Sequence, residues 1–363
     1  MGWRNFNYII GAMLLGWCGV AQAQQAGMDA ELSYIGEEVW NVKGGIKKGK
    51  SYLGTGDMTV NIDTEQSGWW QGGGLFIEAL INHGRDPSSF VGDIQTLSNI
   101  ADGNRTRLQQ LWFEQAVGEY LSILVGLQDM NSEFYVSDYA SLFLNSSFGI
   151  GPEISANIPT SIWPEAGWAT RLAVENKHFY VRIAAYDGNP ATRALRAGRE
   201  GVMWIAESGL HRGASAYKIG VWHHTGPKTA PDGRLFHADS GAYALVDQSI
   251  TSNAGVFLQL GYAQPERNDI ASYVGFGIHL DGVVPGRRQD QFGVAVARAA
   301  FSRVNRQVNT LTTAETSLEI TYDMAMTDWL SIHPAVQWVF HPGGDSKLAT
   351  AHVMMLRVEL ALP

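Results

Sequence analysis

Apolar and polar side chains alternate strictly over long stretches of this sequence, and few folds accommodate that pattern. In residues 315–326, ETSLEITYDMAM, Leu318 and Ile320 fall on one face, and Glu319 and Asp323 fall on the other. Successive side chains of an extended strand point to opposite faces, so one face is expected to contact apolar material and the other water or polar groups. The segment is therefore predicted to be a half-buried β-strand.

The same period of two recurs along the chain between short turn sequences. Counted this way, the chain has about 14 to 16 strands, which falls in the size range of outer-membrane barrels. Residues 108–117 alternate less cleanly; there we expect Trp112 and Glu114 to face inward. The turn sequences are YDGNP, APDG, VPG and HPGG, and the alternating segments are 121–128, 168–175, 179–186, 217–222, 256–262, 273–280 and 354–360.

A membrane barrel explains the alternation better than a soluble sandwich does. After residue 23 there is no run of 18 apolar residues that would predict a membrane helix. The polar faces hold Gly, Ala, Gln, Tyr and paired charges instead of the many lysines that bulk water would favour. Closure would also remove sheet edges. We predict an all-β, transmembrane antiparallel β-barrel with an aromatic girdle at its strand ends, formed by Trp69, Trp70, Trp168, Trp204 and Trp329.

The N-terminus has the form of a signal peptide. Arg4 precedes a short apolar segment, and AQA at 21–23 is a small-residue cleavage sequence. Residues 1–23 are therefore expected to be removed, residues 24–50 have no clear prediction, and the barrel is expected over 51–363. The full chain has 35 acidic and 26 basic residues, and removal of Arg4 makes the exported chain still more acidic, so it is a poor partner for nucleic acid.

Several blocks of the chain resemble the OprB family of carbohydrate-selective porins. The likeness covers nearly all of the mature chain in order, although the chain closes on Leu362 and Pro363 where such porins usually end on an aromatic residue. The blocks are GWWQGG at Gly68, SNIADGNRTRLQQLWFEQ at Ser98, LVGLQDMNSEFYVSDYASLFLNSSFGIGP at Leu124, AAYDGNP at Ala184, GAYALVDQ at Gly241, GIHLDGVVPGRRQD at Gly277, ETSLEITY at Glu315 and HPAVQWVFHPGG at His333.

The resemblance implies a barrel of about 16 strands in the outer membrane of a Gram-negative bacterium. It implies passive, selective diffusion of carbohydrates, glucose-like monosaccharides first, into the periplasm. The expected partners are sugars, outer-membrane lipid and lipopolysaccharide, and the barrel-assembly machinery. A monomer and a homo-oligomer are both left open, and no cofactor is expected.

Residues 131–166 form the longest segment without a strand pattern. Long irregular segments are uncommon unless they are functional, so we predict that this one folds into the barrel as a constriction loop. The alternative is an extracellular cap above the pore.

Inward-facing polar and aromatic residues are the candidate pore lining. Aromatic rings would offer flat surfaces to a sugar, and charged groups would bond its hydroxyls. For any one charged residue, a bracing ion pair is favoured over sugar contact. Arg85, Arg105 and Arg107 lie in or beside a loop and could line an entrance. The pore-lining set is Trp112, Glu114, Trp163, Arg171, Tyr180, Arg182, Lys218, Trp222, Glu319 and Arg357.

Other function classes have less support. The sequence contains no G-x-S-x-G, H-E-x-x-H or P-loop motif, so neither an enzyme nor a metal site is predicted. The alternatives are a general or small-anion diffusion porin of the same fold and, less favoured, a secreted sugar-binding β protein.

Overall fold

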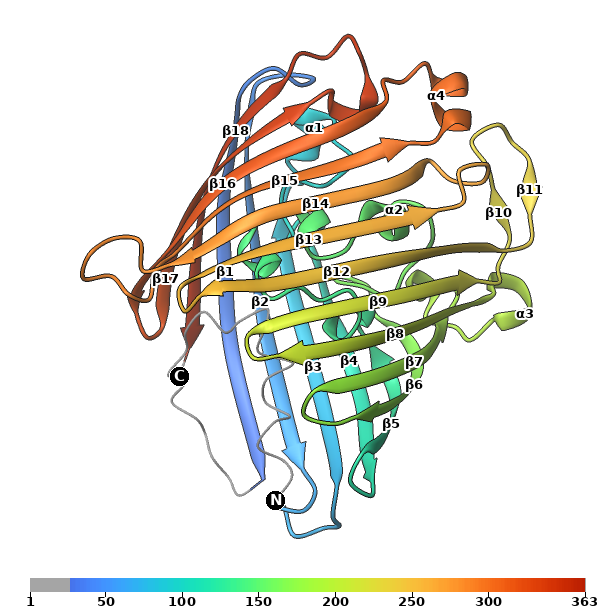
Figure 1. Ribbon diagram of the computed structural model, residues 1–363, viewed down its shortest axis with the longest axis vertical. Helices are drawn as coiled ribbons and strands as arrows, with labels where there is room; N and C mark the ends of the chain where they lie inside the picture. Colours follow the sequence, from blue (N-terminus) through green and yellow to red (C-terminus); the bar gives the residue numbers. More distant parts are fainter. Residues whose placement is uncertain (1–26, 363) are drawn as a thin grey trace.

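A computed structural model describes residues 27–362; the predicted signal peptide, residues 1–23, lies outside the described residues. Sixteen antiparallel strands form one closed barrel (Figure 1), as the alternation predicts, and β1 pairs with β18 to complete it. The barrel strands are β1 (Met28–Lys43), β2 (Gly49–Asp63), β3 (Gly73–Gly84), β4 (Arg105–Val117), β5 (Leu121–Gln128), β6 (Gly167–Glu175), β7 (Phe179–Asp187), β8 (Val202–Arg212), β9 (Ser215–His224), β12 (Asp239–Thr251), β13 (Ala254–Ala263), β14 (Ile270–Asp281), β15 (Gln291–Phe301), β16 (Ala314–Thr327), β17 (Leu330–Phe340) and β18 (Ala351–Leu362).

The connections hold only short elements. None of the helices within residues 27–362 is long and apolar enough to cross a membrane. The α-helices are α1 (Ser88–Val91), α2 (Pro152–Ser155), α3 (Ala197–Glu200) and α4 (Arg303–Asn309), the 3-10 helices are η3 (Met130–Ser132), η4 (Ala140–Leu142), η5 (Ser146–Phe148), η6 (Pro190–Thr192) and η7 (Pro342–Gly344), and β10 (Lys228–Thr229) pairs with β11 (Leu235–Phe236).

The barrel begins earlier than the sequence predicts. Strand β1 lies inside residues 24–50, for which the sequence gives no clear prediction, so the wall starts ahead of residue 51. Its alternation is hidden because Ile35 and Val39 point inward and pack on apolar residues of the interior. Glu38 is on the outer face, where it pairs with Lys50.

Strand β16, which contains residues 315–326, has the orientation that the alternation of its side chains predicts. On β16, Glu315 and Glu319 are fully buried inside the barrel, whereas Ile320 on the outer face is 36% exposed. Other strands show the same division, with Val296 of β15 and Met354 of β18 exposed on the outside. The outer surface is therefore apolar, as lipid contact requires.

The two rims differ in the lengths of their connections. Turns at one end are tight, such as Gly213–Ala214 between β8 and β9, whereas the segments 85–104 and 129–166 lie at the other end. In outer-membrane barrels the short turns face the periplasm and the long loops face outside. Exposed tryptophans mark both rims, as predicted: Trp69, Trp70 and Trp329 at the short-turn end, and Trp168 and Trp204 at the long-loop end.

Candidate functional site

The interior of the barrel holds residues 129–166, the segment between β5 and β6. In Figure 1 its short helices lie within the ring of strands. Inward-facing side chains from several parts of the wall contact it: the Gln259 amide of β13 donates to the Phe148 carbonyl over 2.8 Å, and the Lys218 ammonium of β9 donates to the Val136 carbonyl over 2.6 Å. The predicted inward folding of this loop is therefore present.

Three wall carboxylates accept backbone N–H groups of this loop. Glu207 of β8 accepts from Tyr135 over 3.0 Å, and Asp247 of β12 accepts from Asp138 over 3.0 Å. Glu319 of β16 accepts from Leu144 over 2.7 Å and Asn145 over 3.0 Å. Buried N–H groups need partners, and ionised acceptors make strong ones. The acidic faces of the strands thus position the loop.

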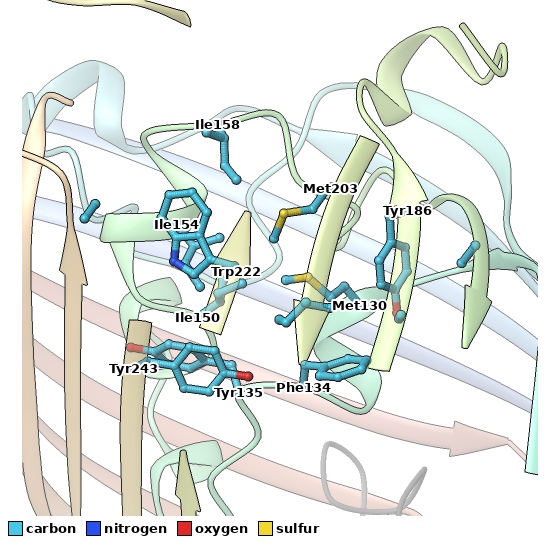
Figure 2. Close-up of a cluster of buried hydrophobic side chains, with 14 of the residues drawn as sticks. Met130, Phe134, Tyr135, Ile150, Ile154, Ile158, Tyr186, Met203, Trp222 and Tyr243 are labelled. Atoms are coloured by element: carbon cyan, nitrogen blue, oxygen red, sulfur yellow. The ribbon is translucent and has the colours of Figure 1, made fainter. Parts of the chain in front are cut away.

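Apolar packing supplements these bonds. In Figure 2, side chains of the loop and of the wall interleave in one buried cluster. The rings of Tyr135 and Tyr243 lie 4.6 Å apart, centroid to centroid. The loop contributes Met130, Phe134, Tyr135, Ile150, Ile154 and Ile158, and the wall contributes Tyr186, Met203, Ile205, Trp222, Tyr243 and Leu245.

A second segment, residues 85–104 between β3 and β4, also folds inward. The Glu315 carboxylate accepts the backbone N–H of Ile94 and of Gln95, at 3.0 and 3.1 Å, and the Gln337 amide donates to the Leu97 carbonyl over 2.8 Å. The sequence does not predict this second inward segment, because its attachment uses backbone groups that leave no pattern in the sequence.

The two inward segments are bonded to each other. Asn99 N–H donates to the Leu144 carbonyl over 2.8 Å, and Ser146 N–H donates to the Thr96 carbonyl over 3.0 Å. We call segments 85–104 and 129–166 together the internal loops.

Most of the predicted pore-lining residues form buried networks. The guanidinium of Arg171 lies 2.7 Å from both Glu114 and Glu133, and the latter is in the internal loops. Arg182 donates to the Glu133 carbonyl over 3.0 Å. Burial opposes ionisation of Glu133, but these two arginines outweigh it and hold the pKa of Glu133 below its ordinary value. These charges brace the wall and the loop, as the favoured interpretation expects.

The remaining members are distributed around the interior. Trp112 stacks on Phe76 with centroids 5.1 Å apart, and Trp222 lies in the buried cluster of Figure 2. The Tyr180 hydroxyl donates to Glu207 over 2.6 Å. Arg357 donates to Glu37 over 2.7 Å, and Trp163 is half-buried. The structure therefore does not bring the ten predicted residues together in one site.

A charged recess does form at the long-loop rim. Its volume is about 310 Å³, and the start of β4 meets the β5–β6 and β7–β8 connections there. Asp102 lies 2.6 Å from Arg105 and 3.0 Å from Arg107, and Arg105 also lies 2.5 Å from Glu165. The lining residues are Arg105, Thr106, Arg107, Glu165, Pro190, Ala191 and Arg193.

The recess is permanently charged at neutral pH. Burial alone would raise the pKa of Asp102, but hydrogen bonds from Asn82 and the Gly103 backbone, together with Arg105 and Arg107, hold it below its ordinary value. Guanidinium groups stay protonated in proteins. The arrangement presents fixed donors and one accessible carboxylate to a ligand, while within residues 27–362 no group of three or more His, Cys, Asp or Glu side chains could hold a metal ion.

Comparison with known proteins places this architecture in a family. The family model described as "Carbohydrate-selective porin, OprB family" matches residues 47–362. Porin B of Pseudomonas aeruginosa is 23% identical over 96% of this chain and 90% of its own length. The high-pH structure of Pseudomonas putida OprB superposes with a TM-score of 0.83, at 20% identity, covering 93% of this chain and 94% of that one.

A more distant channel has the same fold. The outer-membrane channel DcaP of Acinetobacter baumannii gives a TM-score of 0.61 at 10% identity, covering 93% of this chain and 99% of that one. Likeness at this level supports the barrel alone, whereas the family match spans almost the whole described chain. The chain is therefore a member of the OprB family of carbohydrate-selective porins, an outer-membrane channel for carbohydrates.

Proposed function

We propose that the channel passes glucose-like monosaccharides by passive diffusion and selects them at the recess of Arg105, Arg107, Glu165 and Arg193. The supporting observation is the recess itself, since its volume of about 310 Å³ suits a small polar molecule. It lies at the long-loop rim, where a sugar arriving from outside meets the channel first.

The chemistry of the recess matches a sugar. Guanidinium N–H groups donate to hydroxyl oxygens, and the Glu165 carboxylate accepts from hydroxyl groups. Trp163, two residues before Glu165, packs on an apolar cluster of the interior and does not line the recess. Binding must stay weak, because a channel that retained its substrate would not conduct.

Existing contacts hold the arginines in place. Asp102 bridges Arg105 and Arg107, and Arg107 also donates to the Pro164 carbonyl. A sugar therefore meets donors that are already oriented, which lowers the entropy lost on binding. In this proposal the internal loops narrow the path below the recess, because they join opposite parts of the wall.

Single-channel recording in planar bilayers tests the recess. Glucose should reduce the current of the unmodified protein saturably, and the double variant Arg105→Gln/Arg107→Gln should need about tenfold more glucose for half the effect, as loss of about 1.4 kcal/mol predicts. Arg234→Gln removes an exposed arginine of another long loop and serves as the matched control. Equal glucose sensitivity in all three proteins would refute the proposed site.

A small-anion porin is the second candidate, because the recess carries three arginines and one glutamate. The same recordings separate the two functions. A current that responds to the anion of the salt but is indifferent to glucose supports the anion channel.

A further inference from the structure

A cluster of basic side chains lies on the long-loop rim, around the hairpin between β1 and β2. Four of the eight lysines in the chain fall in the ten residues NVKGGIKKGK, at the hairpin between β1 and β2, although the whole chain is acidic. All four lysines are exposed, as is Arg85 at the start of segment 85–104. We call these residues, Lys43, Lys47, Lys48, Lys50 and Arg85, the basic rim.

Most of the basic rim has no charge partner. Among residues 27–362, only Lys50 of the five forms an ion pair, with Glu38 at 2.9 Å. Lys47 and Arg85 both lie over the ring of Phe90, at 5.5 and 5.8 Å from its centroid. Two cations are thus held near one ring, and this mutual repulsion would be relieved by an anion that both could contact.

Lys50 places the outer side of the basic rim at the level of lipid headgroups, whereas Phe90, beside Lys47 and Arg85, lies against the inner face of β2 at Gly49. Lys50 lies over the ring of Trp40, 5.8 Å from its centroid, on the outer face of the barrel. Tryptophan at the end of a lipid-facing strand marks the membrane–water interface. Exposed Leu32 and Met58 continue that face downward along β1 and β2 as apolar surface.

The strand lengths agree with this depth. Strands β1 and β2 have 16 and 15 residues, more than the roughly 9–11 that cross the hydrocarbon core. Their shared end therefore projects beyond the apolar layer on the long-loop side, which is the outside of the cell. Figure 1 shows this hairpin reaching the rim that also carries α1 and the β17–β18 connection.

We propose that the basic rim binds the phosphorylated headgroup of a lipopolysaccharide molecule in the outer leaflet. The glucosamine phosphates of lipid A would meet the exposed lysines of the basic rim, and its acyl chains would lie along the outer face below Trp40. Clusters of lysine and arginine beside a membrane attract anionic lipid headgroups, and each added cation strengthens the attraction.

Lipid binding by the intact purified protein tests the proposal. Bisphosphorylated lipid A in detergent micelles should bind, whereas dephosphorylated lipid A and phosphatidylglycerol should bind much more weakly. The variant Lys47→Gln/Lys48→Gln/Lys50→Gln should lose roughly fivefold in affinity for each lysine removed. Lys177→Gln, which removes an exposed lysine at the opposite rim, should bind as the unmodified protein does.

Two further readouts keep the test independent of folding and of transport. Affinity of the unmodified protein for lipid A should fall as sodium chloride is raised, because salt screens exposed charges. The triple variant should retain its glucose-dependent current, since its lysines lie away from the recess. Equal binding by the triple variant and the unmodified protein, or equal binding of lipid A with and without phosphates, would overturn the proposal.

Discussion

Segments 129–166 and 85–104 both enter the barrel and both attach to β16, but they are held in different ways. The longer segment is bonded to β8, β9, β12, β13 and β16 and has an apolar cluster of its own. The shorter one is held by neighbouring strands on one side of the wall, through Glu315, Gln337 and Arg357. It also has apolar residues, Val91, Leu97 and Ile100, in a second buried cluster with that side of the wall. A segment anchored on opposite parts of the wall should tolerate the loss of one anchor better than a segment anchored on one side.

Deleting the middle of the longer segment, together with its contacts to β13 and β16, should have the largest effect. Removal of residues 139–148, with a Gly-Ser linker across the gap, would eliminate η4 and η5 and the contact with Glu319. We expect single-channel conductance to rise severalfold, since the part of segment 129–166 that crosses the interior of the barrel would be lost. Unchanged conductance would show that this segment does not narrow the path.

Glu315→Ala should be the more disruptive of two substitutions on β16. Its carboxylate accepts from Ile94, Gln95 and Gly343 and therefore ties two connections to the wall. Each donor left unpaired in a buried position costs about 1–3 kcal/mol. We expect a lower midpoint of urea unfolding and noisier current as segment 85–104 moves.

Glu319→Ala should perturb the channel less than Glu315→Ala does, because segment 129–166 keeps Glu207 and Asp247 as anchors. Asp323→Ala is the control, since Asp323 faces inward from the same strand with no hydrogen bond to the internal loops. The same urea and current measurements apply. A larger effect for Glu319→Ala would contradict the distinction between the two segments.

Low pH should stabilise the longer segment in its docked position. Burial raises the pKa of Glu153, in α2, from an ordinary 4.5 to about 7. The docked state therefore binds the proton more tightly than the released state, so docking weakens as pH rises from about 4.5 to about 7 and levels off above that. Current fluctuations should increase over this window, and Glu153→Gln should flatten the response.

Lys218→Met should have the smallest effect. It removes one hydrogen bond, to the Val136 carbonyl, and leaves the apolar stem of the side chain in place. A net contribution of about 0.5–1.5 kcal/mol is typical of such a bond. We expect a small shift in the urea midpoint and no change in conductance; a large change would mean that single anchors matter in the longer segment too.

The wall could be predicted from the sequence because each of its faces has a uniform environment. Lipid outside and polar groups inside impose a period of two, which placed Glu319 inward and Ile320 outward. Strand β1 could not be predicted in the same way, because the internal loops create an apolar patch within the barrel and its residues Ile35 and Val39 point toward that patch. The alternation of apolar and polar side chains is lost where inward-facing residues pack on apolar parts of the internal loops.

The interior could be predicted only in outline. A long patternless segment indicated an inward loop, but which carboxylate meets which N–H depends on contacts between residues far apart in the chain. The sequence predicts Arg85, Arg105 and Arg107 at an entrance, but only the latter two, at the start of β4, line the recess. Glu165 and Arg193 join them from two connections. No local pattern links those residues, so the recess appears only in three dimensions.

The attachment of segment 129–166 to β16 has a consequence for biogenesis. Glu319 lies 175 residues beyond Leu144, to which it is bonded, and the cylinder is completed only when β18 meets β1. Segment 129–166 consequently cannot reach its final position while the sheet is still open. A nascent barrel should pass through a leaky, wide-bore stage, and the size filter of the mature channel would be set in the last step of its assembly.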